Sequence, residues 1–192
     1  MSYVTYTTEA LVCGGYEQNI ADKSFLLFTR EAGMLFATAR SVRAERSKQR
    51  YALQEFSQIR VSLIKGKLGW RVGSVEAIKN DFSSVTSREA RASIIRLYKL
   101  LRRFIRGEEA SVELYDFVIE ALAKISDESV NRKLLDPYIH CQALLLLGYV
   151  DRQQLPAELV DAGIDTIAKK KDEKLQSKLE KLVAKATESS HL

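Results

Sequence analysis

The sequence contains few of the residues on which most catalytic and metal-binding sites depend. Among its 192 residues there are two histidines and two cysteines. Cys13 and Cys141 lie far apart in apolar surroundings, and neither is part of a Cys-x-x-Cys pair. This pattern is typical of a reducing compartment, and it argues against a disulfide framework and a structural zinc site. We therefore expect no metal and no other cofactor.

Long apolar runs are also missing. The longest, ALLLLGYV at 143–150, is much shorter than the roughly 20 apolar residues that a helix needs to cross a bilayer. The N-terminal segment MSYVTYTTEA lacks the basic start and the apolar centre of a secretory signal peptide. We expect a cytoplasmic protein with no membrane partner.

No arrangement of side chains points to catalysis. His140 and Cys141 are neighbours on a segment typical of a helix, and neighbouring helical side chains point about 100° apart, so they do not easily share one site. The glycine pair in CGGY (13–16) lacks the spacing of a dinucleotide-binding loop or a P-loop, and it indicates a bend at a strand end. We expect that the protein is not an enzyme.

Positive charge, by contrast, is concentrated in one part of the chain. Residues 1–80 hold 12 Lys and Arg against 7 Asp and Glu, which equals the whole net charge of +5. Residues 81–150 hold 10 of each sign, and residues 151–192 hold 8 of each. A basic excess confined to one module suggests an anionic partner there, and nucleic acid is the usual one.

Two periodicities divide the chain and predict an α+β fold. The N-terminal part predicts five strands, at 7–15, 22–30, 34–42, 56–65 and 70–78. Five short strands with glycine bends favour a five-stranded OB-fold barrel over residues 1–80, although other small barrels share this pattern. Residues 81–87 are polar and predict a linker. Residues 88–192 have helical periodicity and predict an α-helical domain without a zinc finger.

The helical part predicts four main helices. The first spans 87–106, with a capping box formed by Thr86 and Glu89 and with Gly107 at its end. The second spans 110–125. Asp136 and Pro137 predict the first residues of a third helix that ends at Gly148. The last is a charged amphipathic helix over 172–186.

The stretch FATARSVRAERSKQR (36–50) begins like a buried strand and continues with five Lys or Arg and one acid. Binding to a phosphate backbone needs several cations along a groove but no fixed sequence. Single-strand binders add aromatic rings on which bases stack, and Trp70 is the best candidate, with Tyr51 second. A solvated basic surface and a core tryptophan are the alternatives. The predicted nucleic-acid-binding residues are Arg30, Arg40, Arg43, Arg46, Lys48, Arg50, Arg60, Lys65, Lys67, Trp70 and Arg71.

The helix predicted over 87–106 carries a second basic face. Its cations follow a spacing of three or four residues, with Arg102 beside them, and its only acid is Glu89. Such a face would suit an acidic peptide with a hydrophobic end, or a second stretch of DNA. Compensation by the acids of EEASVELYD (108–116) is an equally good interpretation. The candidate protein-binding residues are Arg96, Lys99, Arg103 and Arg106.

Several segments together resemble the N-terminal OB domain of RecO, a family of bacterial recombination mediators. They are LLFTREAG (26–33), ATARSVRAERSKQRYALQEFS (37–57) and VSLIKGKLG (61–69). The shared features are a Phe-Thr pair, an acidic-glycine turn, a strand that leads into a basic stretch, and a Leu-x-x-Phe before the next strand. ELYDFVIEALAKI and CQALLLLGYV resemble the helical domain of the family.

The resemblance implies a protein that binds and anneals single-stranded DNA. It also implies two partners, the acidic C-terminal tail of single-stranded DNA-binding protein (SSB) and RecR, with which the family helps to load the RecA recombinase. The basic stretch 40–50 would bind DNA, and the basic helix would lie in the domain that receives the acidic tail. An adaptor whose basic surface binds an acidic protein is the alternative function, and an enzyme ranks third.

The sequence departs from the family pattern in three places. Many members have a four-cysteine zinc site after the segment equivalent to LLLLGYV, whereas here DRQQLPAELVDAG follows without cysteine. The chain is also short for the family, which reduces the C-terminal helical region. Ser41 stands where a glycine is expected.

Overall fold

The computed structural model describes residues 5–159 and 162–190. The chain forms two compact units that interleave along the sequence. The barrel unit combines Met1–Ser84 with Ile105–Tyr115, and the helical unit combines Val85–Phe104 with Asp116–Leu192. The predicted boundaries at residues 80 and 88 stay a prediction.

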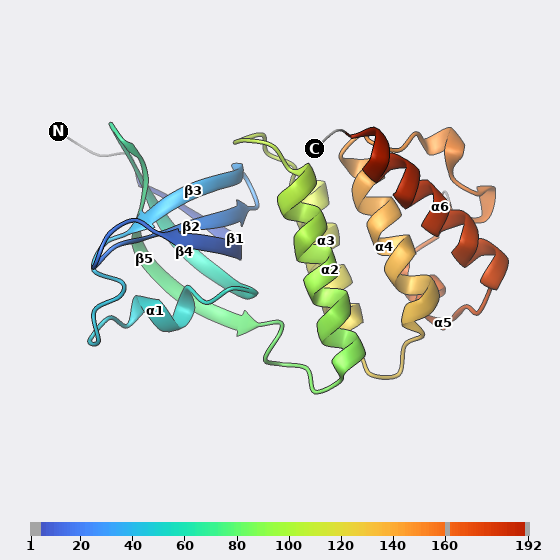
Figure 1. Ribbon diagram of the computed structural model, residues 1–192, viewed down its shortest axis with the longest axis horizontal. Coiled ribbons are helices and arrows are strands. Elements are labelled where there is room, and N and C mark those ends of the chain that lie inside the picture. The colour runs from blue at the N-terminus through green and yellow to red at the C-terminus, as the bar shows by residue number, and fades with distance from the viewer. Residues whose placement is uncertain (1–4, 160–161, 191–192) are drawn as a thin grey trace. The chain divides into compact units, whose positions relative to one another are not determined.

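The barrel unit is built from five strands that close on themselves in the order β1-β2-β3-β5-β4 (Figure 1). All neighbouring strands pair antiparallel except β3 and β5, which pair parallel. A short helix, α1 (Gln49–Ala52), follows the third strand. The strands are β1 (Thr5–Glu17), β2 (Lys23–Thr29), β3 (Gly33–Ala39), β4 (Ser57–Gly66) and β5 (Gly69–Asn80). The predicted N-terminal five-stranded barrel followed by helices is confirmed.

The core of the barrel comes mainly from alternate residues of β1, β2, β3 and β4. On β4, Ile59, Val61 and Leu63 are buried while Arg60 is exposed, as the alternation in the sequence predicts. Phe25, Leu27, Leu35 and Ala37 from β2 and β3 belong to the same buried cluster. Burying each of the larger side chains among them, Phe, Leu, Ile or Val, contributes about 1.5–3 kcal/mol. The residues between them, among them Leu26, Phe36 and Thr38, therefore lie on the outward face of the barrel.

The helical unit contains the four predicted helices and several short elements. In the described residues, no helix is long and apolar enough to cross a membrane. The short elements, α5 and two 3₁₀ turns, have no more than six residues and were not predicted. The helices are α2 (Arg88–Phe104), α3 (Val112–Ile125), α4 (Arg132–Leu146), α5 (Ile164–Lys169) and α6 (Glu173–Ser189), with 3₁₀ turns at Arg152–Gln154 and Ala157–Leu159.

The predicted start of the third helix is wrong. The helix, α4, begins at Arg132, and the side chain of Asn131 caps it by accepting a hydrogen bond from the Lys133 N–H at 3.2 Å. Pro137 lies inside the helix, at the cost of one backbone hydrogen bond. Asp136 accepts hydrogen bonds from Ser93 and Arg96 on α2 and is therefore an ion-pair partner instead of a cap.

The two ends of α2 also differ from the prediction. Ser87, not Thr86, caps the helix, because its Oγ accepts from the Ala90 N–H at 3.3 Å while Thr86 donates to Glu128. The helix ends at Phe104, two residues before the predicted end. Directly beyond Phe104 the chain belongs to the barrel unit. There the Gly107 carbonyl accepts a hydrogen bond from the Met34 N–H at 2.9 Å. Arg106 consequently lies outside the helix.

Candidate nucleic-acid interface

The outward face of β1, β2 and β3 carries two exposed aromatic side chains. Tyr16 on β1 is 51% exposed and Phe36 on β3 is 50% exposed. Their ring centroids lie 5.5 Å apart, and the rings meet edge to face at 65°. Leu26 pairs with Phe36 across β2 and β3 and lies on the same face. We call Tyr16 and Phe36 the aromatic pair.

A β-bulge turns Tyr16 outward. The register of β1 against β2 shifts between Val12 and Gly14, so that Val12 opposes the buried Leu27 but Gly14 opposes the outward Leu26. Without the extra residue, the period of two would place Tyr16 inside the barrel. The glycine pair at 14–15 thus lies within β1, directly after the bulge at Cys13, and the prediction of a bend at a strand end is wrong.

One end of this face is covered by residues of the same unit. The rings of Phe28 and Tyr115 lie 5.4 Å apart, and both side chains are buried. A Cβ atom on Gly33 would lie 2.4 Å from the Glu109 carbonyl oxygen. Residues 105–115 therefore close the face beyond Phe28, and the aromatic pair lies on the part that remains open.

The loop between β1 and β2 is tied to the start of the basic stretch. The Asp22 carboxylate accepts hydrogen bonds from the Ser41 N–H at 2.7 Å and from the Asn19 side chain at 3.0 Å. Both bonds lower the pKa of Asp22, and the bond from Ser41 has the larger effect. Ser41 has a φ of 52°, in the left-handed region that glycine prefers, which explains why a glycine is expected there.

Four of the predicted DNA-binding cations form ion pairs within the barrel unit. The acids are Glu31 for Arg30, Glu17 for Arg43, Glu9 for Arg60 and Glu108 for Lys65, at 3.2–3.6 Å. All these side chains are substantially exposed, so each pair contributes about 1 kcal/mol at most. A phosphate group can therefore compete with the acids at little cost.

Other predicted cations are exposed and lack an ion pair within the described part of the chain. Arg40, Arg46, Lys48 and Lys67 are exposed, and none forms an ion pair with a residue that the structure describes. Arg40 follows the last residue of β3 directly, and the others lie in the turns that lead to α1 or from β4 to β5. The strand thus ends at Ala39, and the charged half of the stretch is an exposed connection.

The remaining predicted residues are placed as follows. Arg50 lies 4.8 Å over the ring of Tyr51 and donates to its hydroxyl at 2.8 Å. Arg71 on β5 is half-buried and pairs with Thr38 of β3, next to Phe36. Arg50 therefore borders the basic stretch, and Arg71 borders the face that carries the aromatic pair.

Trp70 is half-buried and packs against the barrel core. Its indole N–H donates to Glu108 at 3.0 Å, and the Lys65 ammonium group lies 4.8 Å from the ring centroid. Because part of the ring is occupied by these contacts, base stacking on Trp70 stays a prediction. The aromatic pair, which the sequence interpretation missed, is more exposed.

The cations on α2 are partly used inside the helical unit. Arg96 forms an ion pair with Asp136, and Arg103 donates to the Thr187 carbonyl near the end of α6 at 2.8 Å. Lys99 and Arg106 are exposed and have no ion pair with any described residue. Binding of an acidic partner by these four residues stays a prediction.

His140 and Cys141 are the candidate catalytic pair of the sequence. Neither side chain is charged or activated at neutral pH. Burial lowers the pKa of His140 to about 4 and raises the pKa of Cys141 to about 11. Both side chains are therefore neutral at pH 7. Among residues 5–159 and 162–190, no group of three or more His, Cys, Asp or Glu could hold a metal ion.

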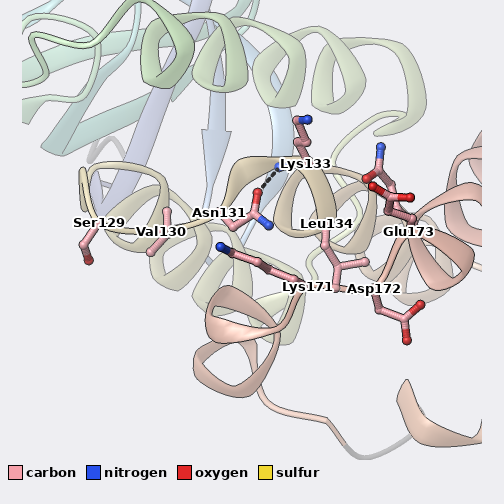
Figure 2. A pocket seen from close by; sticks show the side chains of 9 residues that line it. Ser129, Val130, Asn131, Lys133, Leu134, Lys171, Asp172 and Glu173 are labelled. Carbon is pink, nitrogen blue, oxygen red and sulfur yellow. Dashed lines mark hydrogen bonds between the residues drawn. The ribbon is translucent and has the colours of Figure 1, made fainter.

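A pocket of about 470 Å³ lies in the helical unit between the first turns of α4 and α6 (Figure 2). Lys133 and Lys171 line it together with Asp172 and Glu173, so its charges balance. Asp172 caps α6 by accepting from the Leu175 N–H at 3.0 Å, as Asn131 caps α4. Two of the polar side chains of the pocket, Asn131 and Asp172, are thus explained by helix capping.

No protein-family model matches the chain. Among curated proteins, the chain is similar to the DNA repair protein RecO of Dehalococcoides mccartyi, with 24% identity over 144 residues. The match covers 75% of this chain but only 56% of the length of that relative. The resemblance that the motifs indicate is confirmed by this similarity.

Proposed function

We propose that the chain acts in DNA repair by binding single-stranded DNA on the outward face of its barrel. The observation that carries the proposal is the aromatic pair, two half-exposed rings 5.5 Å apart on an OB-type barrel. In OB folds, the face formed by the second and third strands and its flanking loops commonly bind oligonucleotides. The basic excess of residues 1–80 and the similarity to a DNA repair protein point in the same direction.

In this proposal the rings and the cations have different tasks. Unpaired bases stack on Tyr16 and Phe36, which favours single strands because the bases of a duplex are already stacked on each other. The phosphates lie against the exposed cations Arg40, Arg46 and Lys48. These contacts need no particular base, so binding is insensitive to sequence.

The finer role follows the family resemblance. We propose a cytoplasmic, non-enzymatic recombination mediator that anneals single strands and helps to load a recombinase onto strands coated by SSB. The acidic tail of SSB would bind the exposed cations of the helical unit, and RecR would be a further partner. The exposure of Lys99 supports the first contact.

The test of the proposed function is a titration of a fluorescent oligonucleotide against salt. The single-strand affinity should fall steeply as salt rises, with a slope of about −0.7 per neutralised phosphate on a log–log plot. Replacing Arg46 or Lys48 by alanine should make the slope shallower by about 0.7 for each lost contact. Lys178→Ala, an exposed lysine on α6, is the control and should change nothing. Absence of measurable single-strand affinity at low salt would contradict the proposal.

A second prediction concerns the acid that pairs with Lys65. In Glu108→Gln the amide can still accept the hydrogen bond from Trp70, but it no longer neutralises the lysine. Since such an exposed pair is worth up to about 1 kcal/mol, single-strand affinity should rise by up to about fivefold. Glu113→Gln removes the same charge from an exposed position on α3 and is the control. Equal effects of both variants would assign the gain to net charge alone.

A further inference from the structure

The turn between β4 and β5 forms a tight, ordered tip. Gly66 pairs with Gly69, so only Lys67 and Leu68 connect the two strands. Gly69 has a φ of 107°, which L-residues rarely adopt, and this glycine permits the turn. We call residues 65–71 the hairpin tip.

The apex of the hairpin tip is an aliphatic side chain surrounded by cations. Leu68 is fully exposed and takes no part in the barrel core. Lys65 and Lys67 are exposed within three residues of it. The Arg71 side chain lies next to the turn. Its Nε atom would be 3.7 Å from a Cβ atom placed on Gly66. The apolar Leu68 side chain thus projects beyond three positively charged side chains.

The base of the hairpin tip is held in place. The Trp70 indole donates to Glu108, the Lys65 ammonium group pairs with the same carboxylate, and Trp70 itself packs on the barrel core. All these groups belong to the barrel unit. The backbone of a tip anchored in this way is held in place, which limits the conformational entropy that is lost when Leu68 inserts into a partner.

The hairpin tip is also continuous with the proposed single-strand surface. Trp70 and Arg71 pair with Ala37 and Thr38 of β3, directly beside Phe36. A strand whose bases stack on the aromatic pair therefore reaches the tip within a short distance along the sheet.

We propose that the hairpin tip is a wedge that enters the base stack of duplex DNA at a junction with single-stranded DNA. Leu68 inserts beside the first base pair and unstacks it, while Lys65, Lys67 and Arg71 hold the phosphates on either side. Apolar side chains of architectural proteins unstack base steps in this way. These three cations favour DNA over an apolar protein surface as the partner. This inference rests on the proposed function, because the single strand delivers the junction to the tip.

The test uses a forked duplex with 2-aminopurine, a fluorescent base quenched by stacking, in the first base pair beside the single-stranded arm. Saturating wild-type chain should raise the fluorescence by about twofold or more. Leu68→Ser should abolish most of this rise, while its affinity for a single strand, measured by anisotropy, stays within about twofold of the wild type. Because Leu68 is fully exposed, the substitution leaves the fold intact.

Ile20→Ser provides the matched control. Ile20 is 93% exposed in the loop between β1 and β2, so the same aliphatic side chain is lost at another exposed site. This variant should retain the full fluorescence rise. A normal rise with Leu68→Ser, or no rise with a wild-type chain that binds single strands, would overturn the wedge alone. A wild-type chain that does not bind single strands would overturn the proposed function and the wedge together.

Discussion

The double variant Tyr16→Ala/Phe36→Ala should bind single-stranded DNA at least thirtyfold more weakly than the wild type, because each stacked base contributes about 1–3 kcal/mol. The salt dependence should not change, since no cation is removed. Both rings are half-exposed and lie outside the barrel core, so the variant should fold normally. Fluorescence anisotropy at several salt concentrations measures both quantities.

Conservative variants separate stacking from other effects. Tyr16→Phe keeps the ring and should keep the affinity. Tyr51→Ala removes another exposed aromatic side chain, which is 63% exposed and covered on one face by Arg50. We expect a smaller loss from this variant than from the loss of the aromatic pair. If Tyr51→Ala weakens binding more than the double variant does, the bases stack beside α1 and not on the outward face of β1–β3.

The second large effect is expected from Gly33→Ala, which should destabilise the barrel unit by about 3–5 kcal/mol. Gly33 has a φ of 65°, and its Cβ would lie 2.4 Å from the backbone oxygen of Glu109. Alanine therefore suffers both a strained backbone and a collision with backbone atoms that cannot easily move. Trp70 is the only tryptophan and belongs to the barrel unit, so denaturant unfolding followed by its fluorescence reports this unit.

Gly107→Ala is the matched control for Gly33→Ala. Its φ of 66° is nearly the same, but a Cβ there would meet no atom within 4 Å. It should cost about 1–2 kcal/mol, the price of the left-handed backbone alone. Equal destabilisation by both substitutions would mean that the close approach of the Glu109 backbone adds no steric cost for a Cβ atom at position 33.

The features that could be predicted from the sequence are those that depend on local periodicity. Ile59, Val61 and Leu63 alternate with polar residues, and the structure buries all three. Ile94, Leu97 and Leu101 follow a helical spacing and lie buried on α2. Each pattern repeats within one element, and the hydrophobic effect alone decides which face is buried.

The features that were missed depend on contacts between distant segments. Tyr16 points outward only because of a bulge against β2, and a single extra residue reverses the alternation. Phe36 stands in an apolar run. The sequence alone does not show that its position lies on a part of the outward face that nothing covers. Asp136 stands before a proline, as a helix N-cap often does, but it forms an ion pair with Arg96 on another helix. In each case a partner far away in the sequence outweighs the local preference.

The most direct measurement is photochemical cross-linking of the chain to a single-stranded oligonucleotide that contains 5-iodouracil, followed by mass spectrometry of the modified peptides. Iodouracil couples preferentially to aromatic side chains that stack on it. We expect cross-links to Tyr16 or Phe36, with flanking peptides from the basic stretch 40–50. Cross-links confined to α2–α6 of the helical unit, with none on β1 or β3, would contradict it.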